Sequence, residues 1–171
     1  METSILKVKL KQVHQQLWNT VAAMEPMLQA KQPGGKWSAV QHVQHINKGT
    51  GAVYKYLELD KPTVTQMFGL AEKPSRSYAE SMTFFAKYVT GAVSTQRFVP
   101  DANESISFAE EHQKGIHIVN GLITTLDRWT ENELDKYSCP HPLLGKLTVK
   151  EMLYFTLFHA QHHLNTVEGI H

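Results

Sequence analysis

Apolar residues recur every three or four positions along most of the chain, which is the spacing of one face of an α-helix. This pattern predicts helices over residues 4–30, 38–59, 77–93, 104–129 and 148–167. Pro26 is expected to kink or shorten the end of the first helix. No segment shows the sustained alternation of apolar and polar residues that would indicate strands. The prediction is therefore an all-α fold, a four-helix bundle with one extra helix in the long middle connection.

Capping motifs support three of these helix starts. In a capping box, a Ser or Thr is followed three residues later by Glu or Gln, and each side chain accepts a hydrogen bond from the other residue's backbone N–H. Such motifs begin at Ser38, Ser77 and Thr148. Asn103 is the predicted N-cap of the helix over 104–129. Residues 60–76 and 139–147 contain Pro and Gly and are predicted to be connections, with His141 hydrogen-bonded to a turn in the second.

Length and composition suit one globular domain over residues 1–171, with 42% hydrophobic residues to form its core. The 17 basic and 16 acidic side chains give a formal net charge of +1 and are scattered along the chain, so nucleic acid is not an expected partner. No apolar run approaches the roughly 18 residues of a membrane span. The N-terminal stretch does not resemble a signal peptide, and the single cysteine, Cys139, cannot form an internal disulfide. We therefore expect a cytoplasmic protein.

The ten histidines are an unusual number for a chain of 171 residues. His159 and His163 are four residues apart in the last predicted helix, so they share one face of it. That face also carries Met152 and Val167 and should point into the bundle, whereas His162 is less clearly inward. An inward pair of imidazoles at this spacing is a common way to hold a transition metal on a helix.

Two ligands bind a metal weakly, and a catalytic centre usually has three protein ligands and one open position. The helix over 38–59 offers His42 and His45 as the third ligand. The apolar periodicity slightly favours His42, which lies nearer the centre of the stripe, but spacing alone does not decide between the two. The competing interpretation of each residue is a core histidine with a satisfied ring nitrogen and no metal.

The stretches around these histidines resemble the DinB/YfiT-like superfamily. In that family a Trp-Ser or Trp-Thr pair precedes a helix whose metal-binding histidine lies eight residues after the tryptophan. The stretch GGKWSAVQHVQHI has this form, and eight residues after Trp37 is His45. The stretch HPLLGKLTVKEMLYFTLFHAQHHLNTV is similar to the family's last helix, whose His-x-x-x-His pair falls on His159 and His163. The resemblance covers both helices in the same order, and most of the chain.

The resemblance implies a four-helix bundle in which His45, His159 and His163 hold a divalent metal ion, most commonly nickel or zinc. Members of the family include metal-dependent hydrolases, and metal-dependent transferases that use a low-molecular-weight thiol such as bacillithiol or mycothiol. We therefore expect an enzyme that acts on a small molecule, as a thiol S-transferase or a hydrolase. No acidic residue lies clearly on the inner helix faces as the base of a hydrolase. His42 and His162 are candidates for orienting ligands or carrying protons.

Two other functions stay open at this point. A non-catalytic bundle that binds a metal or a small ligand, for example in a stress response, would explain the missing carboxylate base. A structural bundle with core histidines would bind no metal, and chelators would leave its thermal stability unchanged. The sequence also leaves a homodimer open, because helical bundles of this kind often pair.

Overall fold

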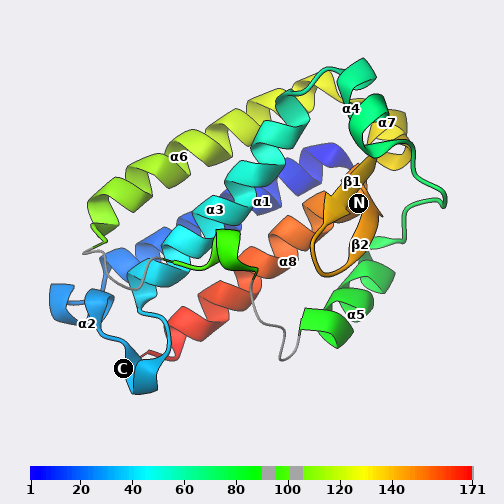
Figure 1. The fold of residues 1–171 in the computed structure, drawn as a ribbon. Helices are drawn as coiled ribbons and strands as arrows, with labels where there is room; N and C mark the ends of the chain where they lie inside the picture. The colour runs from blue at the N-terminus through cyan, green and yellow to red at the C-terminus, as the bar shows by residue number, and fades with distance from the viewer. Residues whose placement is uncertain (90–94, 101–105, 171) are drawn as a thin grey trace.

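Four long helices lie side by side and form the body of the molecule (Figure 1). The computed structural model describes residues 1–89, 95–100 and 106–170. The four helices are α1 (Thr3–Ala22), α3 (Ala39–Glu58), α6 (Phe108–Thr125) and α8 (Val149–Glu168). α1 and α3 each pack against both α6 and α8, and buried aliphatic and aromatic side chains fill the space between them. The predicted all-α bundle is confirmed. None of the described helices has both the length and the apolar character that a membrane span requires.

The two helices that carry the candidate histidines begin at their predicted caps. Before α3, the Ser38 hydroxyl accepts a hydrogen bond from the N–H of Gln41, and the Gln41 side chain accepts one from the N–H of Ser38. Thr148 and Glu151 form the same reciprocal pair before α8. Each pair satisfies two backbone donors that the first helical turn leaves without partners.

The first predicted helix is broken at its end, as Pro26 led us to expect. α1 ends at Ala22, and Pro26 starts a separate short helix, α2 (Pro26–Ala30). A proline at the first helical position lacks only an N–H that would have no partner there. The 3₁₀ turn η1 (Pro33–Gly35) then leads into α3, with Gly34 and Gly35 at positive φ.

The middle connection contains the predicted extra helix and a second one that was not predicted. The extra helix is α5 (Tyr78–Val89), capped by Ser77, and the last part of its predicted range, residues 90–93, lies outside the described residues. The prediction that 60–76 is only a connection was wrong, because α4 (Lys61–Phe68) forms there. Its N-cap is Asp60, which accepts a hydrogen bond from the N–H of Thr63. The 3₁₀ turn η2 (Gln96–Phe98) follows α5.

The helix predicted over 104–129 is shorter in the structure. Ser107 caps α6 by accepting a hydrogen bond from the N–H of Glu110, whereas the predicted cap, Asn103, lies outside the described residues. α6 ends at Thr125, and the chain continues as the 3₁₀ turn η3 (Leu126–Arg128). The apolar periodicity runs on through this turn, since Leu126 and Trp129 are both buried, and it therefore overstated the length of the helix.

Two short elements between α6 and α8 were not predicted. The helix α7 (Glu131–Lys136) begins with a capping box at Thr130. A hairpin of two antiparallel strands, β1 (Ser138–His141) and β2 (Gly145–Thr148), occupies the predicted turn-rich link. Strands of four residues are too short for an alternating pattern to stand out in the sequence. The hairpin brings His141 against Phe155 of α8.

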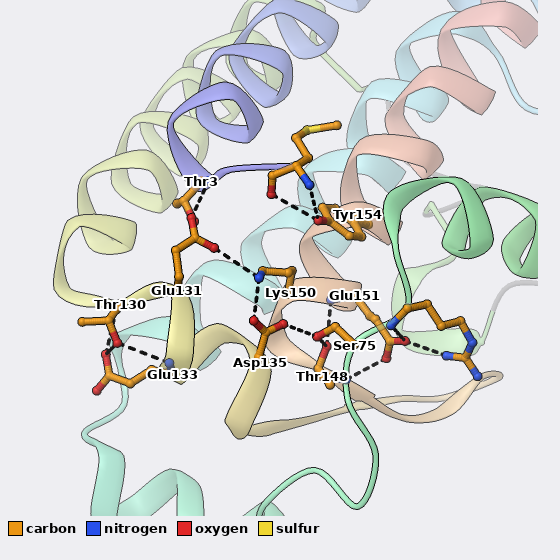
Figure 2. A network of polar contacts seen from close by, with 12 residues as sticks. Thr3, Ser75, Thr130, Glu131, Glu133, Asp135, Thr148, Lys150, Glu151 and Tyr154 are labelled. Carbon is orange, nitrogen blue, oxygen red and sulfur yellow. Dashed lines mark hydrogen bonds and ion pairs between the residues drawn. The ribbon is translucent and has the colours of Figure 1, made fainter.

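Polar contacts hold the start of α8 to the neighbouring segments (Figure 2). The ammonium group of Lys150 forms ion pairs with Glu131 at 3.2 Å and with Asp135 at 2.6 Å. The carboxylate of Glu151 accepts a hydrogen bond from the guanidinium of Arg76 at 2.7 Å, in addition to its capping role. α8 is thus anchored at its first turn to α7 and to the segment before α5. These contacts fix the start of the helix that carries His159 and His163.

Candidate metal centre

Three histidines from two helices converge in the interior of the bundle. His45 lies on α3, and His159 and His163 lie one turn apart on α8. One ring nitrogen of each residue lies within 4.8 Å of those of the other two. The Nε2 atom of His159 is 3.0 Å from Nε2 of His45 and 3.1 Å from Nε2 of His163. The structure therefore brings together the three residues implied by the family resemblance.

The donor set fits a divalent metal ion. Metal–nitrogen bonds of about 2.0–2.1 Å in a tetrahedral zinc site put the ligand nitrogens roughly 3.3 Å apart. The two observed Nε2 separations are within a few tenths of an ångström of that spacing. Neutral imidazoles whose lone pairs face one another repel unless a proton or a cation lies between them. The cluster could hold zinc, nickel, copper or iron, all of which imidazole suits, and its geometry does not select one of them.

A backbone carbonyl orients His45. Its Nδ1 lies 2.8 Å from the carbonyl oxygen of Phe98 in η2. Because a carbonyl can only accept, Nδ1 carries the hydrogen, and the Nε2 lone pair is left to face His159. Lys48, one turn further along α3, donates a hydrogen bond to the carbonyl of Val99 at 2.9 Å. Neither carbonyl contact was predicted from the sequence, because nothing in a sequence marks a backbone carbonyl as the partner of a distant side chain.

His42 lies behind His163 rather than in the cluster. The Nδ1 atoms of the two rings are 2.7 Å apart. When Nδ1 of His163 donates to His42, Nε2 of His163 keeps its lone pair toward the cluster. The periodicity argument slightly favoured His42 as the third ligand, but it is the ring of His45 that lies close to both His159 and His163. His42 is instead in position to orient His163, one of the two roles that the sequence left open.

An aromatic side chain covers one side of the cluster. The ring centroid of Trp37 is 4.8 Å from that of His45 and 6.2 Å from that of His163, and the second pair is stacked. Trp37 also meets the ring of His42 edge-on at 5.6 Å. His162, by contrast, is exposed at the surface, with its ring centroid 5.3 Å from that of His163.

Burial keeps these imidazoles neutral. Removal from water lowers the pKa of both His159 and His163 well below 6.5, and the neighbouring histidines lower it further. Burial also lowers the pKa of His45, although the hydrogen bond to Phe98 partly opposes the shift. The pKa of His42 falls to about 4, again mainly because the ring is buried. At neutral pH each ring therefore keeps the lone pair that metal coordination requires.

A cavity of about 740 Å³ opens beside the cluster, with His45, His159 and His163 in its wall. α3, α8, the hairpin and η2 all contribute to it. Most of the other lining side chains are apolar or aromatic, including Val53, Tyr56, Phe68, Leu144, Met152 and Phe155. Among the described residues, no Asp or Glu lines the cavity. Cavities of this size and character typically take small molecules.

Comparison with known families gives a match over nearly the whole chain. The model of the DinB superfamily matches residues 9–167, a range that includes α3, α8 and all three converging histidines. Searches among curated proteins and among solved structures each gave no match.

Proposed function

Because the chain belongs to the DinB superfamily and three histidines converge in its core, we propose that it is a metal-dependent enzyme acting on a small molecule. The observation that carries the proposal is the meeting of three Nε2 atoms at the wall of the 740 Å³ cavity. His45, His159 and His163 would hold the ion. A coordination position on the side of the cavity would then be open to water or substrate.

The ion would supply a Lewis acid that lowers the pKa of a coordinated water or thiol. The chain's own residues provide the rest of the site. Neutral imidazoles hold the ion, the Phe98 carbonyl and His42 orient two of those imidazoles, and Trp37 shields them on one side. The apolar cavity wall would bind the body of the substrate and limit competing reactions with water.

Of the two reaction types, we favour thiol transfer over hydrolysis. A metal-assisted hydrolase commonly uses a carboxylate as general base, as in the His-Glu-x-x-His enzymes. The described lining of this cavity contains no carboxylate. A low-molecular-weight thiol with a lowered pKa needs no such base, because its thiolate is already the nucleophile. Its sulfur would bond to an electrophilic carbon and displace the leaving group, and the thiol proton would pass to solvent.

The same missing base also favours a second candidate function, in which the bundle binds a metal or a small ligand without turnover. The two functions share the metal centre and differ in whether a substrate is converted. An activity screen of the metal-loaded protein distinguishes the two functions.

The first experiment is elemental analysis of the purified, tag-free protein after incubation with zinc or nickel. We expect about one metal ion per chain, lost in both His45→Ala and His159→Ala. The matched control is His117→Ala, which removes an exposed histidine of α6. Circular dichroism would show that each variant remains folded. Full metal content in the His45 or His159 variant would contradict this ligand set.

The second experiment is a screen of the metal-loaded protein with low-molecular-weight thiols and small electrophiles. Turnover that depends on the metal and is lost in His159→Ala would establish the enzyme and exclude the binding-only function. Stoichiometric metal without turnover of any thiol–electrophile pair or ester would favour the binding-only function instead.

A further inference from the structure

Helices α3 and α8 both contribute residues to the wall of the cavity beside the cluster. On α3, His45, Gly49 and Ala52 follow one another at helical spacing and all line the cavity. On α8, Phe155 and His159 are likewise one helical turn apart and both line the cavity. Gly49 lies beside His159, since a Cβ at Gly49 would be 3.8 Å from the His159 ring, in ordinary van der Waals contact. The histidine cluster and the mainly apolar side chains from both helices therefore line one cavity.

His141 faces this cavity from the hairpin, and its tautomer is fixed by the turn. The backbone N–H groups of Leu143 and Leu144 both point at Nδ1 of His141, at 3.2 and 3.1 Å. Because a backbone N–H can only donate, Nδ1 must accept, and in the neutral ring the hydrogen is on Nε2. The turn contact was anticipated from the sequence. Its consequence is that the remaining ring nitrogen, Nε2, is a hydrogen-bond donor.

His141 and the cluster lie close enough to contact one small molecule. Both His141 and His159 pack on the ring of Phe155, with centroid distances of 4.3 and 5.3 Å. The two imidazole centroids are therefore separated by no more than the sum of these distances. Burial lowers the pKa of His141 to about 4, so the ring stays neutral at physiological pH and keeps its N–H as a donor.

The charges around the cavity restrict what can bind. Its charged lining consists, among the described residues, of Lys55 and Arg97, with no carboxylate. A positively charged ligand would find no counter-ion in that lining, and binding it would cost free energy. The remaining wall is mainly aliphatic and aromatic, which favours a ligand with a large apolar part.

From these observations we infer that the cavity takes a mainly apolar, non-cationic small molecule with a carbonyl-type oxygen, and that His141 Nε2 donates a hydrogen bond to that oxygen. The inference rests on the proposed function in one respect, since it assigns this molecule as the substrate of the centre. Its binding contacts, however, come from the cavity wall and His141. They can be tested in protein from which metal has been removed.

The test compares two probes of nearly equal shape, acetophenone and α-methylstyrene. The second has a methylene group in place of the carbonyl oxygen of the first. Their affinities for the metal-free full chain would be measured by NMR titration. We expect both to bind, and the ratio of their affinities to fall about fivefold in His141→Asn, the factor of one ordinary hydrogen bond. The Asn side-chain oxygen can still accept from the turn, so this variant keeps the hairpin while removing the Nε2 donor.

Two further variants separate the outcomes. His141→Gln places an amide N–H near the position of Nε2 and should restore most of the preference for acetophenone. Ala52→Trp fills the cavity from a half-buried position on α3 and should weaken both probes at least tenfold while leaving zinc uptake unchanged. An unchanged affinity ratio in His141→Asn would overturn the role of His141. Failure of both probes to bind at millimolar concentration, or undiminished binding in Ala52→Trp, would overturn the assignment of the cavity. A protein that takes up no zinc but still shows the expected probe affinities would refute the proposed function alone.

Discussion

The hydrogen bond between His42 and His163 should contribute strongly to metal affinity, and His42→Leu tests this directly. In the metal-free protein, His163 can carry its hydrogen on either ring nitrogen. Once Nε2 binds a metal, the hydrogen must be on Nδ1, which lies 2.7 Å from Nδ1 of His42 in the buried interior. Leucine has a similar volume and cannot accept that hydrogen bond.

The cost of His42→Leu therefore falls on the metal-bound state. A buried N–H without a partner costs about 1–3 kcal/mol, which corresponds to a loss of roughly 5- to 150-fold in zinc affinity. This range agrees with the 10- to 100-fold losses that follow removal of the hydrogen-bond partners of metal-binding histidines. Competition with a chromophoric chelator at pH 7 measures the change.

His42→Asn is the matched control for this prediction. The Asn side-chain oxygen can take the place of the accepting Nδ1, so zinc affinity should stay within about threefold of the wild-type value. Urea unfolding of the metal-free variants would separate a loss of fold from a loss of affinity. If His42→Leu binds zinc as tightly as the unmodified protein, the hydrogen bond does not fix the tautomer of His163, and the reasoning is refuted.

Three more predictions follow from the geometry. Chelator treatment should lower the melting temperature of the zinc-loaded protein by about 5–10 °C, since zinc at 100 times its dissociation constant adds about 2.7 kcal/mol; an equal effect in His159→Ala would show that zinc binds elsewhere. His14 is fully buried, and desolvation lowers its pKa to about 4. As the pH falls below 6.5, the His14 ring is therefore protonated in the unfolded chain before it is protonated in the folded protein. Between pH 7 and 4.5, urea unfolding with chelator present should therefore show a loss of stability about 2–3 kcal/mol larger than in His14→Gln, and equal losses would contradict this assignment. Gly115→Ala should destabilise the fold by about 1–3 kcal/mol in thermal or urea unfolding, because the added Cβ would lie 2.8 Å from both Asn47 and the Trp18 ring; wild-type stability would show that these neighbours move aside freely.

The long helices were predictable because each has a sufficiently continuous apolar pattern and, for α3 and α8, a capping box at its start. The short elements were not. α4 begins at a proline-containing turn that was interpreted as a break, and each strand of the hairpin has only four residues. Their conformations depend on contacts made with the rest of the fold, such as the hydrogen bond from Tyr56 to the carbonyl of Ser138 in β1.

The choice between His42 and His45 shows a different limit of the sequence pattern. Periodicity identifies an inward face only where another face is exposed. All residues from 39 to 47 of α3 are buried, so both histidines lie inside the protein and the apolar stripe cannot rank them. The family resemblance pointed to His45 through its distance from Trp37. The carbonyl of Phe98 and the orientation of His141 required the three-dimensional structure.

Phe98 takes part in two features of the site. Its backbone carbonyl orients a candidate metal ligand, and the residue also lines the cavity. Almost any residue at position 98 supplies the same carbonyl, but each presents a different surface to the cavity. Mutations here can therefore change which molecules fit without altering the orientation of His45. During divergence of related proteins, this position would offer a route to new substrate preference that preserves the centre.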